Sequence, residues 1–168
     1  MRLDPVARTV RFEQAGMELD PGGIGKGYAI DRMVGVLKRH GVAIALLSAS
    51  GSSIYGMGAP PNEPGGWKVT IRAARNPRAA AAEVLLEDMS ISTSGGYEKF
   101  FWADDRAYSH IIDPRTGRPA RGASAVSVLA PRTIDSEAWT KPYFVNGRAD
   151  FRVFFCEDAP DETCTWIQ

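Results

Sequence analysis

One glycine-rich stretch decides the organisation of the chain: Asp20-Pro21-Gly22-Gly23-Ile24-Gly25-Lys26-Gly27. Apolar side chains follow it at nearly helical spacing and stop before Gly41: Ile24, Tyr28, Val34 and Leu37. The pattern predicts a loop that opens a helix. Backbone N–H groups at a helix N-terminus attract phosphate, glycines allow close approach, and Lys26 adds a positive charge. A pyrophosphate would fit this loop, although a glycine-rich turn that serves only strand-to-helix packing gives the same pattern.

The composition is that of an ordinary globular protein. The 168 residues include 20 Lys and Arg against 20 Asp and Glu, so the net charge is zero, and 44% are hydrophobic. This balance excludes proteins that hold nucleic acid or an anionic membrane by bulk electrostatics. The apolar runs are shorter than the roughly 20 residues that span a bilayer, and no signal peptide is visible. We expect one domain over residues 1–168 and no membrane span in this chain.

Strand patterns dominate after the first helix. Runs bounded by Gly, Asp or Pro predict strands at residues 9–12, 42–48, 51–58, 67–72, 82–86, 89–93, 97–102, 107–112 and 125–129. A second helix is predicted over residues 135–146, capped by Thr133 or Asp135 and kinked or broken at Pro142. Runs of strands with only two helices predict an α+β fold.

The two cysteines, Cys156 and Cys164, fall on a predicted C-terminal hairpin that could place their sulfur atoms opposite each other. Two cysteines are too few for a disulfide framework or a structural zinc site. A disulfide and two free thiols both remain open, because disulfides depend on an oxidising compartment.

A second polar motif ends a predicted strand in a turn: Ser109-His110-Ile111-Ile112-Asp113-Pro114-Arg115-Thr116-Gly117. His110 could serve there as a base or proton relay, three residues before Asp113. Alternatively, Asp113 caps its own backbone turn and His110 packs inside.

Two further segments carry oxygen atoms suited to ligands. Ser92-Thr93-Ser94-Gly95-Gly96-Tyr97 suits a loop lying on a nucleotide or ring, or simply a polar bend between strands. Asp135, Glu137 and Thr140 offer oxygen ligands for a hard cation such as Mg²⁺, although acidic residues in a first helical turn also favour the helix dipole.

The order and the amino-acid sequences of these segments resemble those of the ApbE family, the FAD:protein FMN transferases. The matching segments are residues 18–31, 90–100 and 108–117, and the resemblance runs from about residue 19 to residue 147. It implies an ApbE-like α+β fold with a mostly antiparallel sheet and two main helices. It also implies a magnesium-dependent enzyme of the bacterial periplasm or cell envelope. Such an enzyme cleaves its substrate FAD, attaches FMN to a threonine of a target protein and releases AMP.

The resemblance also implies roles for individual residues. Lys26 would hold the flavin nucleotide, the Gly23 carbonyl would ligate the metal, His110 would assist proton transfer, and Asp113 would support it. Further residues expected at the flavin nucleotide are Gly22, Gly25, Tyr28, Ser92, Thr93, Ser94 and Gly95. The remaining metal ligands are expected among Asp135, Glu137 and Thr140.

The chain departs from the family pattern in three ways. The N-terminal part that supplies some FAD contacts is expected to be missing, which would leave apolar surface and a strand edge exposed. Ser50-Gly51-Ser52-Ser53 replaces a Gly-Gly-Asn or Gly-Gly-Asp turn. Glu137 and Lys141 stand where the metal motif has aspartate and threonine, and a protonated lysine cannot ligate Mg²⁺. The alternative is therefore a non-catalytic flavin- or nucleotide-binding relative, or an inactive fragment. We expect Lys26 and His110 to share one cleft.

Overall fold

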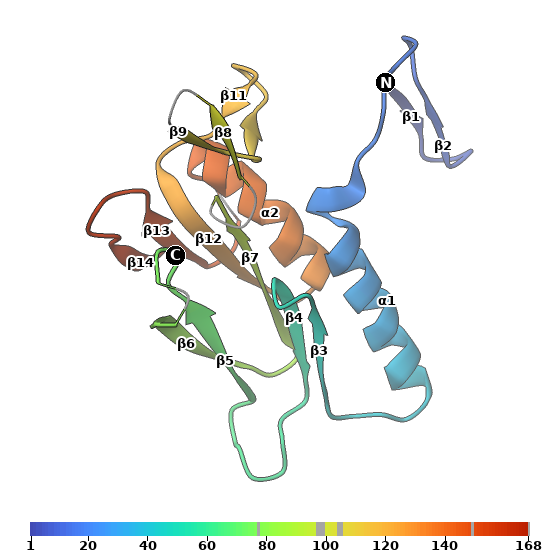
Figure 1. Ribbon diagram of the computed structural model, residues 1–168. Helices are drawn as coiled ribbons and strands as arrows, with labels where there is room; N and C mark the ends of the chain where they lie inside the picture. The colour runs from blue at the N-terminus through green and yellow to red at the C-terminus, as the bar shows by residue number, and fades with distance from the viewer. Residues whose placement is uncertain (77, 97–99, 104–105, 149, 168) are drawn as a thin grey trace.

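The computed structural model describes residues 1–76, 78–96, 100–103, 106–148 and 150–167. Its centre is a six-stranded antiparallel sheet with the order β14-β13-β12-β7-β4-β3 (Figure 1). The strands are β3 (Ala45–Ala49), β4 (Ser53–Met57), β7 (Met89–Gly95), β12 (Ala123–Ala130), β13 (Val153–Glu157) and β14 (Cys164–Ile167). The predicted α+β fold with a mostly antiparallel sheet is confirmed.

Two helices cover one face of this sheet. The helix α1 (Gly25–Arg39) lies against β3 and β4, and α2 (Thr133–Asn146) lies against β7, β12 and α1 (Figure 1). A short 3-10 helix, η1 (Pro21–Gly23), leads into α1, so the predicted loop and first helix are confirmed. Ile30 and Val34 form the buried face of α1. They share one core cluster with Leu47 of β3 and with Tyr55 and Met57 of β4.

The opposite face is covered by the hairpin of β5 (Trp67–Arg72) and β6 (Ala80–Leu86). Val69 and Ile71 of this hairpin share a core cluster with Ala125 of β12. The next residue of β12, Val126, belongs to the cluster around α2, because successive side chains of a strand point to opposite faces. The central strands are therefore buried on both sides, and α2 is held in a fixed position above them.

The start of α2 corrects the predicted cap. Neither Thr133 nor Asp135 caps the helix; it begins after Arg132, whose side chain makes no cap hydrogen bond. Instead, the Asp31 carboxylate of α1 accepts hydrogen bonds from the N–H groups of Thr133 (2.8 Å) and Ile134 (3.0 Å). A carboxylate from the neighbouring helix thus meets the unpaired N–H groups and the positive end of the dipole.

The predicted break at Pro142 is also wrong, because α2 continues through this residue to Asn146. The helix packs on the sheet and on α1, and such tertiary contacts override an unfavourable local propensity.

Three small hairpins complete the described strands. They are β1 (Arg2–Asp4) with β2 (Thr9–Arg11), β8 (Phe100–Ala103) with β9 (Arg106–Ser109), and β10 (Ile112–Asp113) with β11 (Arg118–Pro119). The strand predicted at residues 107–112 is therefore interrupted, and His110 lies in the connection between β9 and β10. The hairpin of β1 and β2 stands apart from the sheet (Figure 1).

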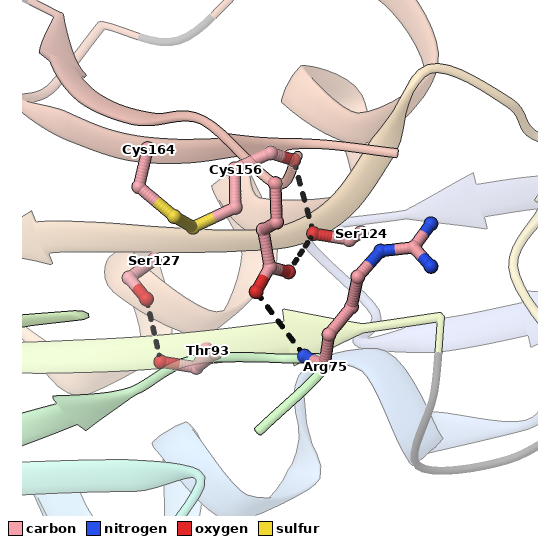
Figure 2. The surroundings of a disulfide bond; sticks show 7 residues. Arg75, Thr93, Ser124, Ser127, Cys156 and Cys164 are labelled. Carbon is pink, nitrogen blue, oxygen red and sulfur yellow. Dashed lines mark hydrogen bonds between the residues drawn. A yellow bond between two sulfur atoms is a disulfide. The ribbon is translucent and has the colours of Figure 1, made fainter. Parts of the chain in front are cut away.

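The C-terminal hairpin of β13 and β14 is closed by a disulfide. Cys156 and Cys164 are direct partners in its register and are bonded to each other (Figure 2). Of the two alternatives that the sequence left open, the structure therefore has the disulfide. Beside them, the Ser124 hydroxyl lies 2.7 Å from Glu162 Oε1 and 3.3 Å from the Cys156 carbonyl oxygen. Glu162 Oε2 also accepts a hydrogen bond from the Arg75 N–H, which ties this end of the chain to the β5–β6 connection.

Apolar side chains are exposed at the start of α1, along it and on β3. They are Ile24, Tyr28, Met33, Val36 and Leu46. Because β3 is the last strand of the sheet, its outer edge has no strand partner in the described part of the chain. No helix within the described residues combines the length and apolar character needed to cross a membrane.

Candidate functional site

The glycine-rich loop enters α1 through η1, which Asp20 caps. Asp20 Oδ1 accepts a 2.7 Å hydrogen bond from the Gly22 N–H. The Gly22 N–H is therefore engaged inside the loop, and the role of this residue at the nucleotide stays a prediction. Gly25 opens α1, and a Cβ on it would meet only the Pro21 Cβ at 3.7 Å, so the helix start is uncrowded.

Gly27 marks a point where α1 and α2 come into direct backbone contact. A Cβ on Gly27 would overlap the Thr133 carbonyl oxygen and would lie 2.8 Å from the Ile134 Cα. The Gly27 N–H donates a 2.6 Å hydrogen bond to Glu137 Oε2. Only glycine fits between the helices here, and the close approach brings a buried carboxylate to the positively polarised first turn of α1.

Lys26 connects this carboxylate to the sheet. Its Nζ donates a hydrogen bond of 2.5 Å to Ser52 Oγ and lies 3.8 Å from Glu137 Oε1. The Glu137 side chain is only 2% exposed, whereas that of Lys26 is 41% exposed. Glu137 Oε1 is buried and has no hydrogen-bond partner among the described residues. The Lys26 ammonium is thus held in place while remaining accessible to a ligand.

A second ammonium, that of Lys141, also lies near Glu137. Its Nζ donates hydrogen bonds of 3.2 Å to the carbonyl oxygens of Gly23 and Glu137. Burial lowers the pKa of Lys141; the nearby Glu137 opposes this shift and Lys26 adds to it. Lys26 and Lys141 therefore both lie near Glu137, and the cluster has one more positive than negative charge.

Two of the expected metal ligands have other partners. The Asp135 carboxylate forms a bidentate ion pair with Arg132, at 2.6 and 2.7 Å, and is thereby directed away from a role at Gly23. The Thr140 hydroxyl is fully buried and hydrogen-bonded to Ser94 Oγ (2.8 Å) and to the Glu137 carbonyl (2.7 Å). Of the two alternative carboxylates, only Glu137 lies at the loop.

The remaining oxygen atoms do not fit Mg²⁺. This ion requires a near-octahedral shell of oxygen ligands, but the Gly23 carbonyl already accepts a hydrogen bond from the Lys141 ammonium. Glu137 Oε1 is available, yet it lies beside the Lys26 ammonium. Within the described ranges, no cluster of three His, Cys, Asp or Glu side chains is suited to a metal. The magnesium site stays a prediction, and the structure places two lysine ammonium groups near these oxygen atoms.

The polar segment of β7 packs α2 onto the sheet. Ser92 and Ser94 are buried and hydrogen-bonded at 2.8 Å to the hydroxyls of Ser136 and Thr140 of α2. Thr93 faces the opposite side and is hydrogen-bonded to Ser127 of β12 (2.7 Å; Figure 2). The hydroxyls of Ser92 and Ser94 therefore join α2 to the sheet, whereas Thr93 also lines a cavity of about 230 Å³ together with Ser52. Contact of these three residues with a nucleotide stays a prediction.

The structure says less about three other residues that the sequence analysis placed at or near the nucleotide. Gly95 lies in β7 opposite Ala125 of β12. Tyr28 is 56% exposed on α1, one residue beyond Gly27, and its role at the nucleotide stays a prediction. Tyr97, the aromatic residue of the polar segment, lies outside the described residues.

The turn after His110 is held by an arginine. Arg115 Nε and Nη2 donate to the two carboxylate oxygens of Asp113, at 2.9 and 2.7 Å, and Nη2 also donates to the Val145 carbonyl at the end of α2. These hydrogen bonds lower the pKa of Asp113. Asp113 therefore stays ionised and fixes the turn against α2, while His110 is exposed just before it.

A cavity of about 560 Å³ lies beside this turn. Its lining includes Asp113, Arg115, Arg118, Arg121 and Val145, but neither Lys26 nor His110. The single cleft shared by Lys26 and His110 stays a prediction. Val145 follows Lys141 by four residues, a rise of about 6 Å along α2, so the turn and the lysine cluster lie along the same helix.

Sequence reasoning did not assign Gly27, Ser52 or Asp31 to the site. Gly27 was visible only as one of four glycines, and nothing in the pattern distinguished it from the others. Ser52 was visible as a departure from the family turn, and its hydroxyl supplies the partner of Lys26. Asp31, which anchors α2 next to Gly27, ends the quoted loop-and-helix segment and has no local signal of its own.

Comparisons with known proteins agree with this architecture. The model of the ApbE family matches residues 1–163. An FAD:protein FMN transferase of Treponema pallidum is 38% identical over 148 residues, covering 83% of this chain and 41% of that protein. The one of Escherichia coli K12 is 29% identical over 164 residues, covering 89% and 45%.

Solved structures give the same picture. The ApbE protein from Thermotoga maritima has a TM-score of 0.85 and 24% identity, with 98% of this chain and 55% of that chain covered, and it shows the shared fold. The apo flavinyl transferase ApbE of Pseudomonas stutzeri has a TM-score of 0.73 and 29% identity, covering 89% and 49%. The chain spans about half the length of the relatives that it matches.

Proposed function

The chain belongs to the ApbE family, and from that premise we propose that it carries the pyrophosphate-binding and proton-transfer residues of a flavin transferase. The reaction is the one in the names of its relatives, transfer of FMN from FAD to a protein. We propose a threonine hydroxyl as the acceptor and AMP as the second product.

The observation that carries the proposal is the positive charge at the start of α1. Lys26, Lys141 and the N-terminus of α1 all contact Glu137, in a chain whose total net charge is zero. Lys26 and the Gly27 N–H lie at its buried carboxylate, and Lys141 lies at its backbone carbonyl oxygen. The pyrophosphate of FAD carries two negative charges, and ammonium groups held in fixed positions stabilise such an anion and the charge that develops during its cleavage. This arrangement supports binding of the FAD pyrophosphate at Lys26.

The transfer itself requires one new bond and one broken bond. The threonine oxygen bonds to the phosphorus of the FMN half, the bond from that phosphorus to the bridging oxygen breaks, and AMP leaves. We propose that His110 takes the hydroxyl proton as the general base. Asp113 acts as a positioning residue, because its ion pair with Arg115 holds the turn that carries His110.

Magnesium, which the family resemblance implies, is left out of this proposal. The lysine cluster does not fit the ion, because the ammonium of Lys141 occupies the Gly23 carbonyl. Lys26, Lys141 and the first turn of α1 supply positive charge at the pyrophosphate instead.

The compartment and the acceptor are proposed on separate grounds. The disulfide between Cys156 and Cys164 supports an oxidising compartment, in accordance with the bacterial periplasm or cell envelope that the resemblance implies. The acceptor protein is defined here only by its chemistry, an accessible threonine hydroxyl that can reach the phosphorus atom.

The two histidines of the chain allow a matched test. The protein is incubated with FAD and a threonine-containing acceptor domain, and covalent flavin fluorescence is measured on the acceptor in a denaturing gel. His110→Asn should reduce the transfer rate by about 10²- to 10⁴-fold, the usual effect of losing a general base. His40→Asn, at the exposed C-terminal end of α1, should leave the rate unchanged. Equal rates for both variants would contradict the role of His110.

A further inference from the structure

The ammonium of Lys141 has the kind of surroundings that a bound metal cation has. It lies on two backbone carbonyl oxygens, Gly23 O and Glu137 O, each at 3.2 Å. One oxygen comes from η1 and the other from α2, and Gly23 lies 118 residues before Lys141 in the sequence. Carbonyl oxygens contributed by separate segments are ligands typical of a hard cation. The side chain of Lys141 delivers a positive charge to that position from within the protein.

The two lysines also have donors to spare. An ammonium has three N–H donors. Lys141 uses two of them on carbonyl oxygens, and Lys26 uses one on Ser52, with Glu137 Oε1 at 3.8 Å beyond hydrogen-bond distance. No further acceptor for either Nζ is recorded in the part of the chain that the structure describes. Each lysine can therefore donate to an anionic ligand without losing the contacts that hold it.

A purely structural tether would not need this arrangement. An apolar side chain could fill the space between η1 and α2 without desolvating a charge, and desolvation is what lowers the pKa of Lys141. Lys26 lies close enough to add to this effect, so two like charges are brought together around one carboxylate. Such repulsion is offset when a dianionic group binds between them.

We propose that Lys141 replaces the divalent cation of this site, so that the chain binds the pyrophosphate of FAD with two ammonium groups and without a metal ion. The proposal rests on the proposed function, because it takes FAD as the ligand. It concerns which group supplies the positive charge at the pyrophosphate. In this respect the chain would differ from a member of the family that needs Mg²⁺.

Two measurements on the unaltered protein test the proposal. The affinity for FAD is measured by quenching of flavin fluorescence, once with EDTA and once with excess MgCl₂, and should be the same. Binding of Mn²⁺, as a probe for the divalent site, is measured by electron paramagnetic resonance, and no tightly bound Mn²⁺ is expected. If FAD binds only with Mg²⁺, or if Mn²⁺ binds tightly, the proposal is overturned while the proposed function stands. Absence of FAD binding under both conditions would overturn both.

A variant pair tests the role of Lys141 itself. Lys141→Met keeps an unbranched side chain, one heavy atom shorter, and removes the charge. It should weaken FAD binding in EDTA by about tenfold or more, the usual loss for a charged hydrogen bond. The control is Lys38→Met on the exposed part of α1. Among the residues that the structure describes, Lys38 forms an ion pair with Asp88, and this variant should bind FAD as the unaltered protein does. Circular dichroism checks that both variants fold. Unaltered affinity of folded Lys141→Met would refute the proposal, and the Mn²⁺ measurement decides it if that variant does not fold.

Discussion

Replacing Gly27 with alanine tests the helix contact on which the site depends. The added Cβ would overlap the Thr133 carbonyl oxygen and approach the Ile134 Cα to 2.8 Å. These are backbone atoms, so no side-chain rotation can relieve the overlap, and α1 and α2 must move apart. The same movement lengthens the 2.6 Å hydrogen bond from the Gly27 N–H to Glu137.

The expected magnitude follows from three contributions. Overpacking costs about 1–3 kcal/mol, and we take the upper end because backbone atoms are involved. Loss of a hydrogen bond to a charged group costs about 1.5 kcal/mol or more. Alanine in place of glycine favours the helix by about 1 kcal/mol. The net destabilisation is about 3.5 kcal/mol, which lowers Tm by about 10 °C for a chain of this size.

Gly35 in the same helix is the matched control. A Cβ there would meet only the end of the flexible Arg39 side chain, at 3.5 Å. Gly35→Ala should therefore stabilise the protein by up to about 1 kcal/mol through helix propensity alone. Both variants are compared by urea unfolding and thermal melting followed by circular dichroism. If Gly27→Ala is as stable as Gly35→Ala, the helices are not in contact at Gly27 and the geometry of the site is wrong.

Three more predictions concern the surroundings of the site. Asp31→Ala removes the acceptor of two N–H groups at the start of α2 and should cost about 1–2 kcal/mol in urea unfolding; unchanged stability would show that α2 is not capped from α1. Replacing Cys156 and Cys164 together by serine opens a loop with a sequence separation of 8 and should cost about 2.5 kcal/mol; dithiothreitol should then lower the Tm of the unaltered protein but not that of the variant. The lowered pKa of Asp113 adds stability above the ordinary pKa of an aspartate, and this contribution is lost as pH falls through the lowered folded-state value. Asp113→Asn should therefore lose less Tm than the unaltered protein between neutral pH and about pH 3, and equal losses would mean that Arg115 does not stabilise the carboxylate.

The local patterns of the sequence were sufficient for most of the fold. The spacing of Ile24, Tyr28, Val34 and Leu37 predicts a helix, which the structure has. Its buried face is only partly the predicted one: Val34 and Leu37 pack toward β3 and β4, but Ile24 and Tyr28 are exposed. The alternation in residues 67–72 predicts a strand with the bounds that β5 has. The strand predicted at residues 107–112 failed at His110, because the backbone turns there before the short strand β10.

The site was harder to predict because its contacts join distant parts of the chain. Glu137 meets Gly27 across 110 residues, and Lys141 meets Gly23 across 118. Asp135 and Glu137 are equivalent in the sequence, and only the packing of α2 makes one a surface ion pair and the other a buried carboxylate. The hydroxyls of Ser92 and Ser94 looked available for a ligand, but α2 covers them. Local periodicity does not encode such pairings.

The most direct test of the account is a crystal structure of this protein with FAD bound in the absence of divalent cations. The account predicts pyrophosphate oxygen atoms within hydrogen-bond distance of Lys26 Nζ and Lys141 Nζ, at the start of α1. A pyrophosphate bound elsewhere, such as the cavity lined by Arg118 and Arg121, with both lysines left as they are, would contradict it.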